Sequence, residues 1–185
     1  MAVYDVEMAF ARVREWVARR WKLVRGRLTK SATIPSPHLA LGLFGERLAA
    51  RRLRSEGYRL VATNFIAPIG HRRDQRLVTG EIDIIAYDEK TDPPTLVFAE
   101  VKTRSSAEWA SPAAAVNRRK QRQIIRTARV YRHLLGVTNE PYRYDVIGIL
   151  VAPGQKTRVE ILAAYFNEDV FGRGRWLEWE ERTSR

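Results

Sequence analysis

The apolar positions between residues 39 and 166 follow two periods, one typical of helices and one typical of strands. Residues 39–55 carry apolar side chains at helical spacing and precede Gly57, which suits the end of a helix, so a helix is predicted there. A longer helix is predicted over about 112–135. The polar, basic stretch 67–79 is predicted to be a loop or hairpin tip. Strands are predicted over residues 58–65, 81–88, 95–102, 142–152 and 157–166.

The segment 95–102 is apolar at almost every position, which is typical of a strand covered on both faces at the centre of a sheet. The helix over 112–135 separates it from the strand over 142–152, and these three elements can form a right-handed crossover between parallel strands. The order of elements therefore predicts an α/β domain over residues 39–166, with a mixed central sheet flanked by helices.

Two charged residues interrupt this central strand. Glu100 and Lys102 share one of its faces, because strand side chains repeat every second residue. By the same alternation Glu81, Asp83 and Ile85 share a face of the preceding strand. If the two strands pair as an antiparallel hairpin, Asp83 and Glu100 lie side by side.

Neighbouring carboxylates repel each other and cost free energy to desolvate, and a divalent cation removes both penalties. Carboxylate oxygens suit Mg²⁺ or Mn²⁺, so Asp83 and Glu100 are predicted metal ligands. Such a metal can promote cleavage of a phosphodiester, and Lys102 can stabilise charge or orient water beside it. The alternative is a buried ion cluster without a metal, in which Lys102 and Lys120 balance the two acids.

The helix over 112–135 has an apolar side and an arginine-rich side. Lys120 projects into the apolar side, where a lysine either extends to solvent or points at an anion, so it is predicted to help position phosphate or water. Residues 111–135 contain seven Lys and Arg and no acid, which favours contact with a phosphate backbone over a solvated face. The predicted nucleic-acid-binding residues are Arg118, Arg119, Arg122, Arg126 and Arg129, with Arg104 after the central strand and Arg72 and Arg73 in the 67–79 loop.

The composition supports a polyanionic partner. Lys and Arg number 33 against 21 Asp and Glu, which gives a formal net charge of +12 and favours either nucleic acid or an anionic membrane surface. The chain has no cysteine, which excludes disulfides and thiolate metal sites. It has no apolar run of about 20 residues and no secretory signal, so no transmembrane segment and a cytoplasmic location are expected.

Two segments flank the predicted domain. Residues 1–38 are predicted to be a basic amphipathic helical extension and linker, because apolar residues recur at helical spacing before Pro35 and Pro37. This extension suits an arm for nucleic acid or a membrane surface, or a helix that packs on the domain or on a partner chain. Residues 167–185 are a C-terminal tail with no predicted element.

Asp83 together with the Glu-x-Lys pair Glu100 and Lys102 resembles the motif of the PD-(D/E)xK nuclease superfamily, with Ile82 in place of the proline of that motif. Over about residues 41–150 the chain also resembles the YraN-like family of uncharacterised bacterial proteins. That resemblance rests on LGLFGERLAARRLRSEGYRLVATNF, GEIDIIA, LVFAEVKTR, AAAVNRRKQRQIIRTARVY and YRYDVIGI. The order of motifs is similar to that of archaeal-type Holliday junction resolvases.

The resemblance implies a restriction-endonuclease-like fold, a divalent-metal-dependent endonuclease acting on DNA, and a homodimer by analogy. It also implies that Glu46 on the first helix supports the metal site and that a polar residue of the long helix, here Lys120, joins it. An ordinary exposed glutamate is the alternative for Glu46. Two other functions stay open: a nucleic-acid-binding module that cuts nothing, and a membrane-surface scaffold that uses the 1–30 helix.

Overall fold

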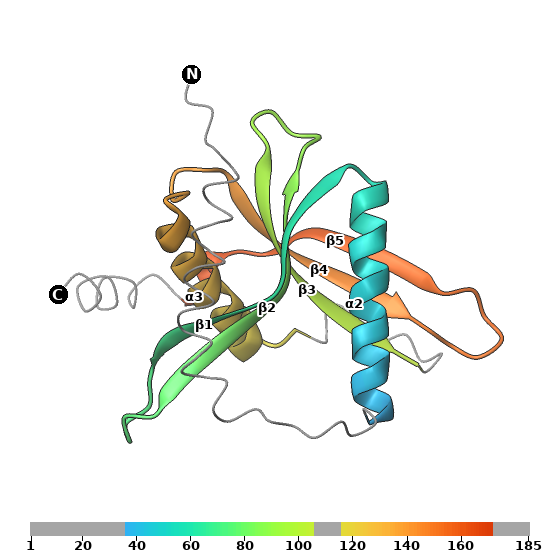
Figure 1. Ribbon diagram of the computed structural model, residues 1–185, viewed down its shortest axis with the longest axis horizontal. Helices are drawn as coiled ribbons and strands as arrows, with labels where there is room; N and C mark the ends of the chain where they lie inside the picture. Colours follow the sequence, from blue (N-terminus) through green and yellow to red (C-terminus); the bar gives the residue numbers. More distant parts are fainter. Residues whose placement is uncertain (1–35, 106–115, 172–185) are drawn as a thin grey trace.

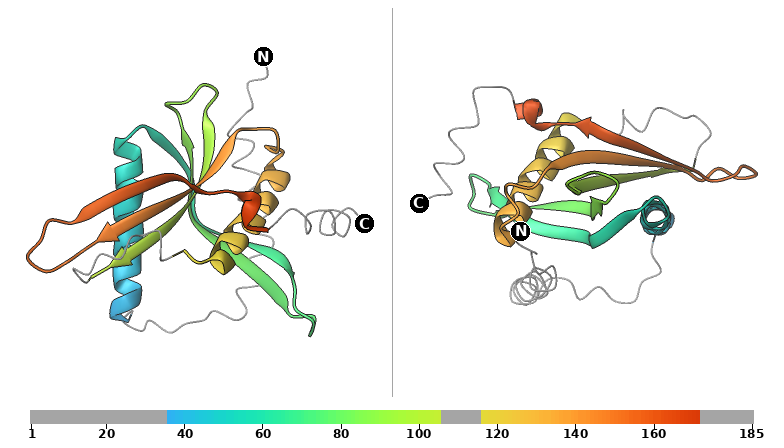
Figure 2. Two further views of the ribbon diagram at one scale, coloured as in Figure 1. Left: turned by 180° about the vertical axis from the view of Figure 1, so that it is seen from behind. Right: turned by 90° about the horizontal axis from the view of Figure 1, so that it is seen from above.

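The computed structural model describes residues 36–105 and 116–171 (Figure 1). The five strands form one sheet in the order β1-β2-β3-β4-β5, and α2 and α3 cover opposite faces of it (Figures 1 and 2). The elements are α2 (Pro37–Ser55), β1 (Tyr58–His71), β2 (Leu77–Asp88), β3 (Thr95–Arg104), α3 (Arg118–Leu135), β4 (Tyr142–Leu150), β5 (Arg158–Phe166) and the short 3-10 helix η2 (Glu168–Phe171).

The sheet is mixed. β1 and β2, β2 and β3, and β4 and β5 pair antiparallel, whereas β3 and β4 pair in parallel. Parallel neighbours need a crossover connection, and α3 lies within the connection between β3 and β4. The predicted α/β class with a mixed central sheet flanked by helices is confirmed, and it is consistent with a restriction-endonuclease-like core.

Strand β3 lies at the centre of the sheet and is buried on both faces. Every residue from Leu96 to Val101 is buried, and alternate side chains enter two different cores. Phe98 packs edge to face on Tyr131 of α3, in what we call the α3-side core. Its neighbour Val97 packs with Leu53 of α2 in the α2-side core. Each of these large apolar side chains contributes about 1.5–3 kcal/mol through burial, so β3 is firmly held where it carries Glu100.

The C-terminal end of α2 agrees with the sequence, but the starts of both helices do not: α2 begins at Pro37, two residues inside the predicted linker, because proline suits the first turn of a helix. Helix α2 ends at Ser55, and Gly57 follows with a left-handed φ of 83°. Helix α3 begins at Arg118, because Asn117 has an extended backbone and its side chain accepts a hydrogen bond from the Lys120 N–H at 3.0 Å. The prediction of a helix that runs unbroken from about residue 112 is therefore wrong, because residues 116 and 117 are not helical. Apolar periodicity alone does not mark a capping residue.

The hairpin of β1 and β2 is longer than predicted. β1 continues to His71 and β2 begins at Leu77, so most of the stretch 67–79 is strand and only its basic tip is a loop. Ala67 and Ile69 are buried, which the surrounding polar and basic residues obscured. The extra strand length lengthens the surface on which α3 packs.

Two glycines allow the helices to approach the sheet closely. A Cβ atom added at Gly45 of α2 would lie 1.8 Å from Thr103 Oγ1 on β3. A Cβ added at Gly80 of β2 would lie 2.0 Å from Thr127 Oγ1 on α3. These approaches position the helix residues Glu46 and Lys120, which the sequence assigned to the candidate site.

Several predictions concern residues outside the described ranges. These are the helical extension at 1–30 and the tail beyond residue 171. Among the helices that the structure describes, none combines the length and the apolar character needed to cross a membrane.

Candidate active site

The candidate site begins where the pairing of β2 and β3 ends. The last paired residues are Ile84 and Ala99, so the next position sets Asp83 opposite Glu100. Asp83 leaves the regular ladder here, and its Oδ2 accepts a hydrogen bond from the backbone N–H of Val101 at 2.7 Å. The two carboxylates that the sequence predicted to be neighbours therefore lie on adjacent strands at the same level.

Glu100 is the most deeply buried acid of this group, with 2% of its surface exposed. Lys102 Nζ donates to its Oε1 at 2.7 Å. Lys120 Nζ reaches across from α3 to within 3.0 Å of Oε2, and also donates to the carbonyl of Glu81 at 3.4 Å. The contact of Lys120 with Oε2 is ionic but lacks hydrogen-bond alignment, so Oε2 has no hydrogen-bond donor among the described residues. An acceptor that is buried and has no donor is costly, and it attracts a cation.

Asp83 has a strongly perturbed acidity. Burial, followed by the charge of Glu100, raises the pKa of Asp83 to about 7. The Val101 N–H and the Lys120 ammonium act in the opposite direction and do not cancel the increase. Asp83 therefore exchanges its proton near neutral pH, unlike an ordinary aspartate.

Glu46 reaches the same region from α2. Its Oε2 accepts a hydrogen bond from Asn64 Nδ2 of β1 at 3.1 Å. Burial, then the charges of Glu81 and Glu100, raises its pKa. Glu46 is thus half-buried and within electrostatic reach of the other acids, rather than an ordinary exposed glutamate.

The side-chain alternation of β2 is interrupted at Asp83. Ile85 and Ile82 both pack in the α3-side core, whereas Ile84 packs in the α2-side core. Residues an odd number apart cannot share a face of a regular strand. The prediction that Glu81 shares a face with Asp83 and Ile85 is therefore wrong, because the strand changes faces between them.

Asp83 and Glu100 supply the hard oxygen donors that Mg²⁺ or Mn²⁺ prefers. Glu100 Oε2, buried and without a hydrogen-bond donor, fits a cation ligand. Within residues 36–105 and 116–171 no group of three or more His, Cys, Asp or Glu side chains is arranged to hold a metal, so other ligands would have to come from backbone, water or substrate. The contacts of Lys102 and Lys120 with Glu100 are also those of the metal-free ion cluster.

The arginine side of α3 is largely covered by the segment η2. Arg122 donates through Nε and a terminal nitrogen to the Val170 carbonyl, at 3.1 Å each. Arg126 and Arg129 lie over the ring of Phe171, with centroid distances of 5.6 and 5.4 Å. Arg129 also pairs with Glu168, at 2.7 Å. The absence of an acid within residues 111–135 therefore does not leave Arg129 unpaired, because its acid, Glu168, comes from a segment about 40 residues away along the chain.

The other predicted nucleic-acid-binding residues are more accessible. Arg118 and Arg119 are exposed at the first turn of α3, and Arg72 and Arg73 are exposed at the tip of the β1–β2 hairpin. Arg104 is half-buried at the end of β3, two residues beyond Lys102.

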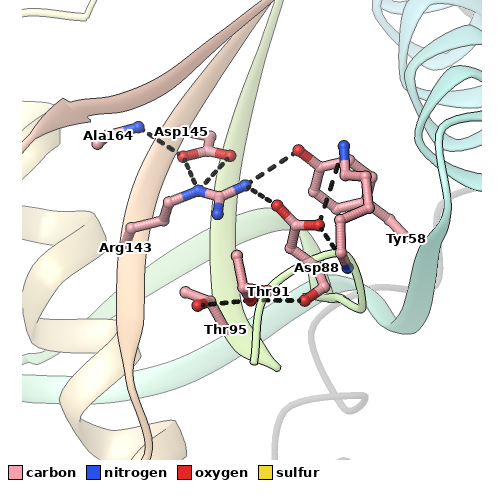
Figure 3. Close-up of polar contacts among 8 residues, drawn as sticks. Tyr58, Asp88, Thr91, Thr95, Arg143, Asp145 and Ala164 are labelled. Carbon is pink, nitrogen blue, oxygen red and sulfur yellow. Dashed lines mark hydrogen bonds and ion pairs between the residues drawn. The ribbon is translucent and has the colours of Figure 1, made fainter. Parts of the chain in front are cut away.

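A second buried charge network lies at the other end of the sheet and joins four strands (Figure 3). Arg143 of β4 donates to Asp145 Oδ1 at 3.0 Å and to Asp88 Oδ2 at 2.9 Å. It also donates to the Tyr58 hydroxyl at 3.0 Å, while Asp145 accepts from the Ala164 N–H at 2.8 Å. The Arg143 contacts lower the pKa of Asp88 although its burial opposes this. This network was not predicted from the sequence, although an arginine and an aspartate two residues apart in an apolar strand, Arg143 and Asp145, were a signal for it.

Comparison with known proteins fits this geometry. A protein-family sequence model described as "Uncharacterised protein family UPF0102" matches residues 45–149 of the chain. The matched range includes all five predicted site residues, Glu46, Asp83, Glu100, Lys102 and Lys120. The chain belongs to the UPF0102 family. It is 39% identical over 145 residues to a UPF0102 protein of Chlorobium limicola, which covers 78% of this chain and 95% of the relative. It is 35% identical over 127 residues to a UPF0102 protein of Symbiobacterium thermophilum, covering 69% and 96%.

These matches confirm the YraN-like assignment, within the restriction-endonuclease-like superfamily.

Proposed function

We propose that this protein is an endonuclease that hydrolyses DNA phosphodiesters, branched or single-stranded DNA among them, and that it requires Mg²⁺ or Mn²⁺. The observation that carries the proposal is the pair of buried carboxylates, in which Glu100, 2% exposed, lies opposite Asp83 on the adjacent strand. Burying two carboxylates together costs free energy unless a cation offsets their charge.

Asp83 and Glu100 would hold the metal, which when bound supplies charge for the phosphate and acidifies water. Lys102, already 2.7 Å from Glu100, can orient water or stabilise the negative charge that develops on the phosphate. Lys120 adds a second cation from α3, and Glu46 contributes a further negative charge from α2. In the absence of metal the two ammonium groups lie against Glu100 and offset its charge.

The surface supports nucleic acid as the partner. The net charge of +12 and the exposed Arg72, Arg73, Arg118 and Arg119 favour contacts with phosphates, with Arg104 near the site. Arg122, Arg126 and Arg129 contribute less than the sequence suggested, because η2 covers them. A homodimer by analogy with resolvases and a cytoplasmic location complete the proposal.

The second candidate function is a non-catalytic nucleic-acid-binding module. It is favoured by one observation, the presence of a lysine ammonium within 3.0 Å of each Glu100 oxygen. Two lysines and two acids balance in charge, so the site could be a stabilising ion cluster. A membrane-surface scaffold would depend on residues 1–30 and stays a weaker alternative.

Cleavage of labelled duplex, single-stranded and four-way-junction DNA, with Mg²⁺, Mn²⁺ or EDTA, tests the proposal. We expect metal-dependent products from the wild type, none from Asp83→Asn, and unchanged products from Asp92→Asn, an exposed aspartate in the turn between β2 and β3. DNA binding without cleavage of any substrate would favour the second candidate. Products that persist equally in Asp83→Asn would reject the assigned site.

A further inference from the structure

Asn64 has an unusual backbone conformation at the level of the candidate site. Its φ is 53°, a left-handed value that asparagine tolerates better than most residues but that is rare inside a strand. The pairs Thr63–Ile84 and Phe65–Ile82 place it directly opposite Asp83.

Both strands change faces at this level. On β2, Ile84 packs in the α2-side core while Ile82 packs in the α3-side core. On β1, Ala62 packs against the α3-side core and Phe65 lies in that core, although residues three apart point to opposite faces of a regular strand. In Figure 1, β1 and β2 change direction near the middle of their length. A left-handed residue produces such a change, because it reverses the side to which the following residues point.

The side chain of Asn64 has a second role. Its Nδ2 donates to Glu46 Oε2 at 3.1 Å. The charges of Glu81 and Glu100 act on Glu46 unfavourably, so a donor that binds its carboxylate holds it where repulsion would otherwise move it.

We propose that Asn64 is a positioning residue of the candidate active site. Its left-handed backbone turns Asp83 toward Glu100, and its amide holds Glu46 beside the same carboxylates. The benefit for cleavage rests on the proposed function, whereas the positioning itself can be tested in the protein without metal or DNA.

Three substitutions separate the two roles. Asn64→Gly keeps the left-handed backbone and removes the amide. Asn64→Ala removes the amide and also disfavours the left-handed backbone. Asn64→Asp keeps the backbone but sets a carboxylate against Glu46. We expect Asn64→Ala to melt about 3–5 °C below Asn64→Gly. The same pair of substitutions at Gln75, left-handed at φ 61° in the exposed hairpin loop, gives the cost of this backbone where the chain can relax. If the alanine and glycine variants differed in melting temperature by the same amount at positions 64 and 75, the backbone role of Asn64 would be overturned.

The amide role has a readout in the intact metal-free protein. We expect the side-chain amide signal of Asn64 in nitrogen–proton NMR spectra to shift in Glu46→Ala. It should stay in place in Glu56→Ala, a control at the end of the same helix. An Asn64 signal that does not respond to Glu46→Ala would overturn the amide role.

Cleavage assays then test the catalytic consequence. Asn64→Gly is expected to lower kcat about tenfold with little change in KM, and Asn64→Asp to lower it further. A wild-type kcat in Asn64→Gly would refute the consequence while leaving the proposed nuclease intact. If the wild type does not cut DNA, the proposed function fails, and the melting and NMR results still decide whether Asn64 positions the acids.

Discussion

The close approach of α2 to β3 can be tested by adding a single methyl group. Gly45 and Gly42 both lie inside α2, but only Gly45 faces a neighbour at short range. A Cβ at Gly45 would lie 1.8 Å from Thr103 Oγ1 and 2.9 Å from Thr103 Cβ, whereas a Cβ at Gly42 would have nothing within 4 Å. Gly42→Ala is therefore a matched control for Gly45→Ala.

The magnitude follows from two opposing effects. Replacing glycine by alanine inside a helix stabilises by about 0.5–1 kcal/mol at either position. Overpacking against Thr103 costs about 1–3 kcal/mol at Gly45 only, because the helix must move away from the strand. We expect Gly42→Ala to be slightly more stable than the wild type, and Gly45→Ala to be about 1–3 kcal/mol less stable than Gly42→Ala.

Urea unfolding at equilibrium measures both variants, and a further substitution identifies the contact. Thr103→Ala removes the two outer atoms of the threonine, including the nearest one, and should recover part of the loss in Gly45→Ala, because Thr103 Cβ at 2.9 Å remains. It should have no such effect in Gly42→Ala. Equal stabilities of Gly45→Ala and Gly42→Ala would refute the reasoning, and so would a Thr103→Ala effect that simply adds to that of Gly45→Ala.

Three further predictions concern stability. Because the pKa of Asp83 is raised to about 7, the native protein keeps a proton between about pH 4 and pH 7 that the unfolded chain loses, so stability falls as pH rises through this window. The free energy of unfolding of Asp83→Asn should then exceed that of the metal-free wild type by at least about 1 kcal/mol at about pH 8 and equal it near pH 4. A difference in urea unfolding that does not change with pH would contradict this. Arg143→Ala should cost about 3–5 kcal/mol because it removes the ion-pair partner of Asp145, which is 1% exposed, and a loss below about 1 kcal/mol would show that the network contributes little. Gly80→Ala should destabilise by about 1–3 kcal/mol through Thr127, and failure of Thr127→Ala to recover part of the loss would reject that contact.

Much of the fold could be predicted because the core has simple patterns. The apolar run in β3 predicted a strand buried on both faces, and the helical period of α2 ended correctly before Gly57. The length of the β1–β2 hairpin could not be read from composition. Ala67 and Ile69 are buried beside basic neighbours, and only α3, distant in sequence, explains why.

The candidate site was partly predictable for the same reason. Pairing of two strands was enough to bring Asp83 opposite Glu100, because a hairpin is a local structure. The ion pair of Arg129 with Glu168 was not predictable, since it depends on where a distant segment packs. Asn64 was not predicted to matter, although asparagine is depleted in strands and an asparagine inside a predicted strand was a signal for a left-handed position.

The proposed function requires that Asp83 and Glu100 bind a divalent cation and do not only form ion pairs with Lys102 and Lys120. Binding of Mn²⁺ to the full-length protein, followed by its electron paramagnetic resonance signal with and without a single-stranded oligonucleotide, tests this directly. We expect a bound ion in the wild type that is lost in Asp83→Asn and in Glu100→Gln but kept in the control Asp92→Asn. No bound Mn²⁺ under either condition, or equal binding in the Glu100→Gln variant, would contradict it.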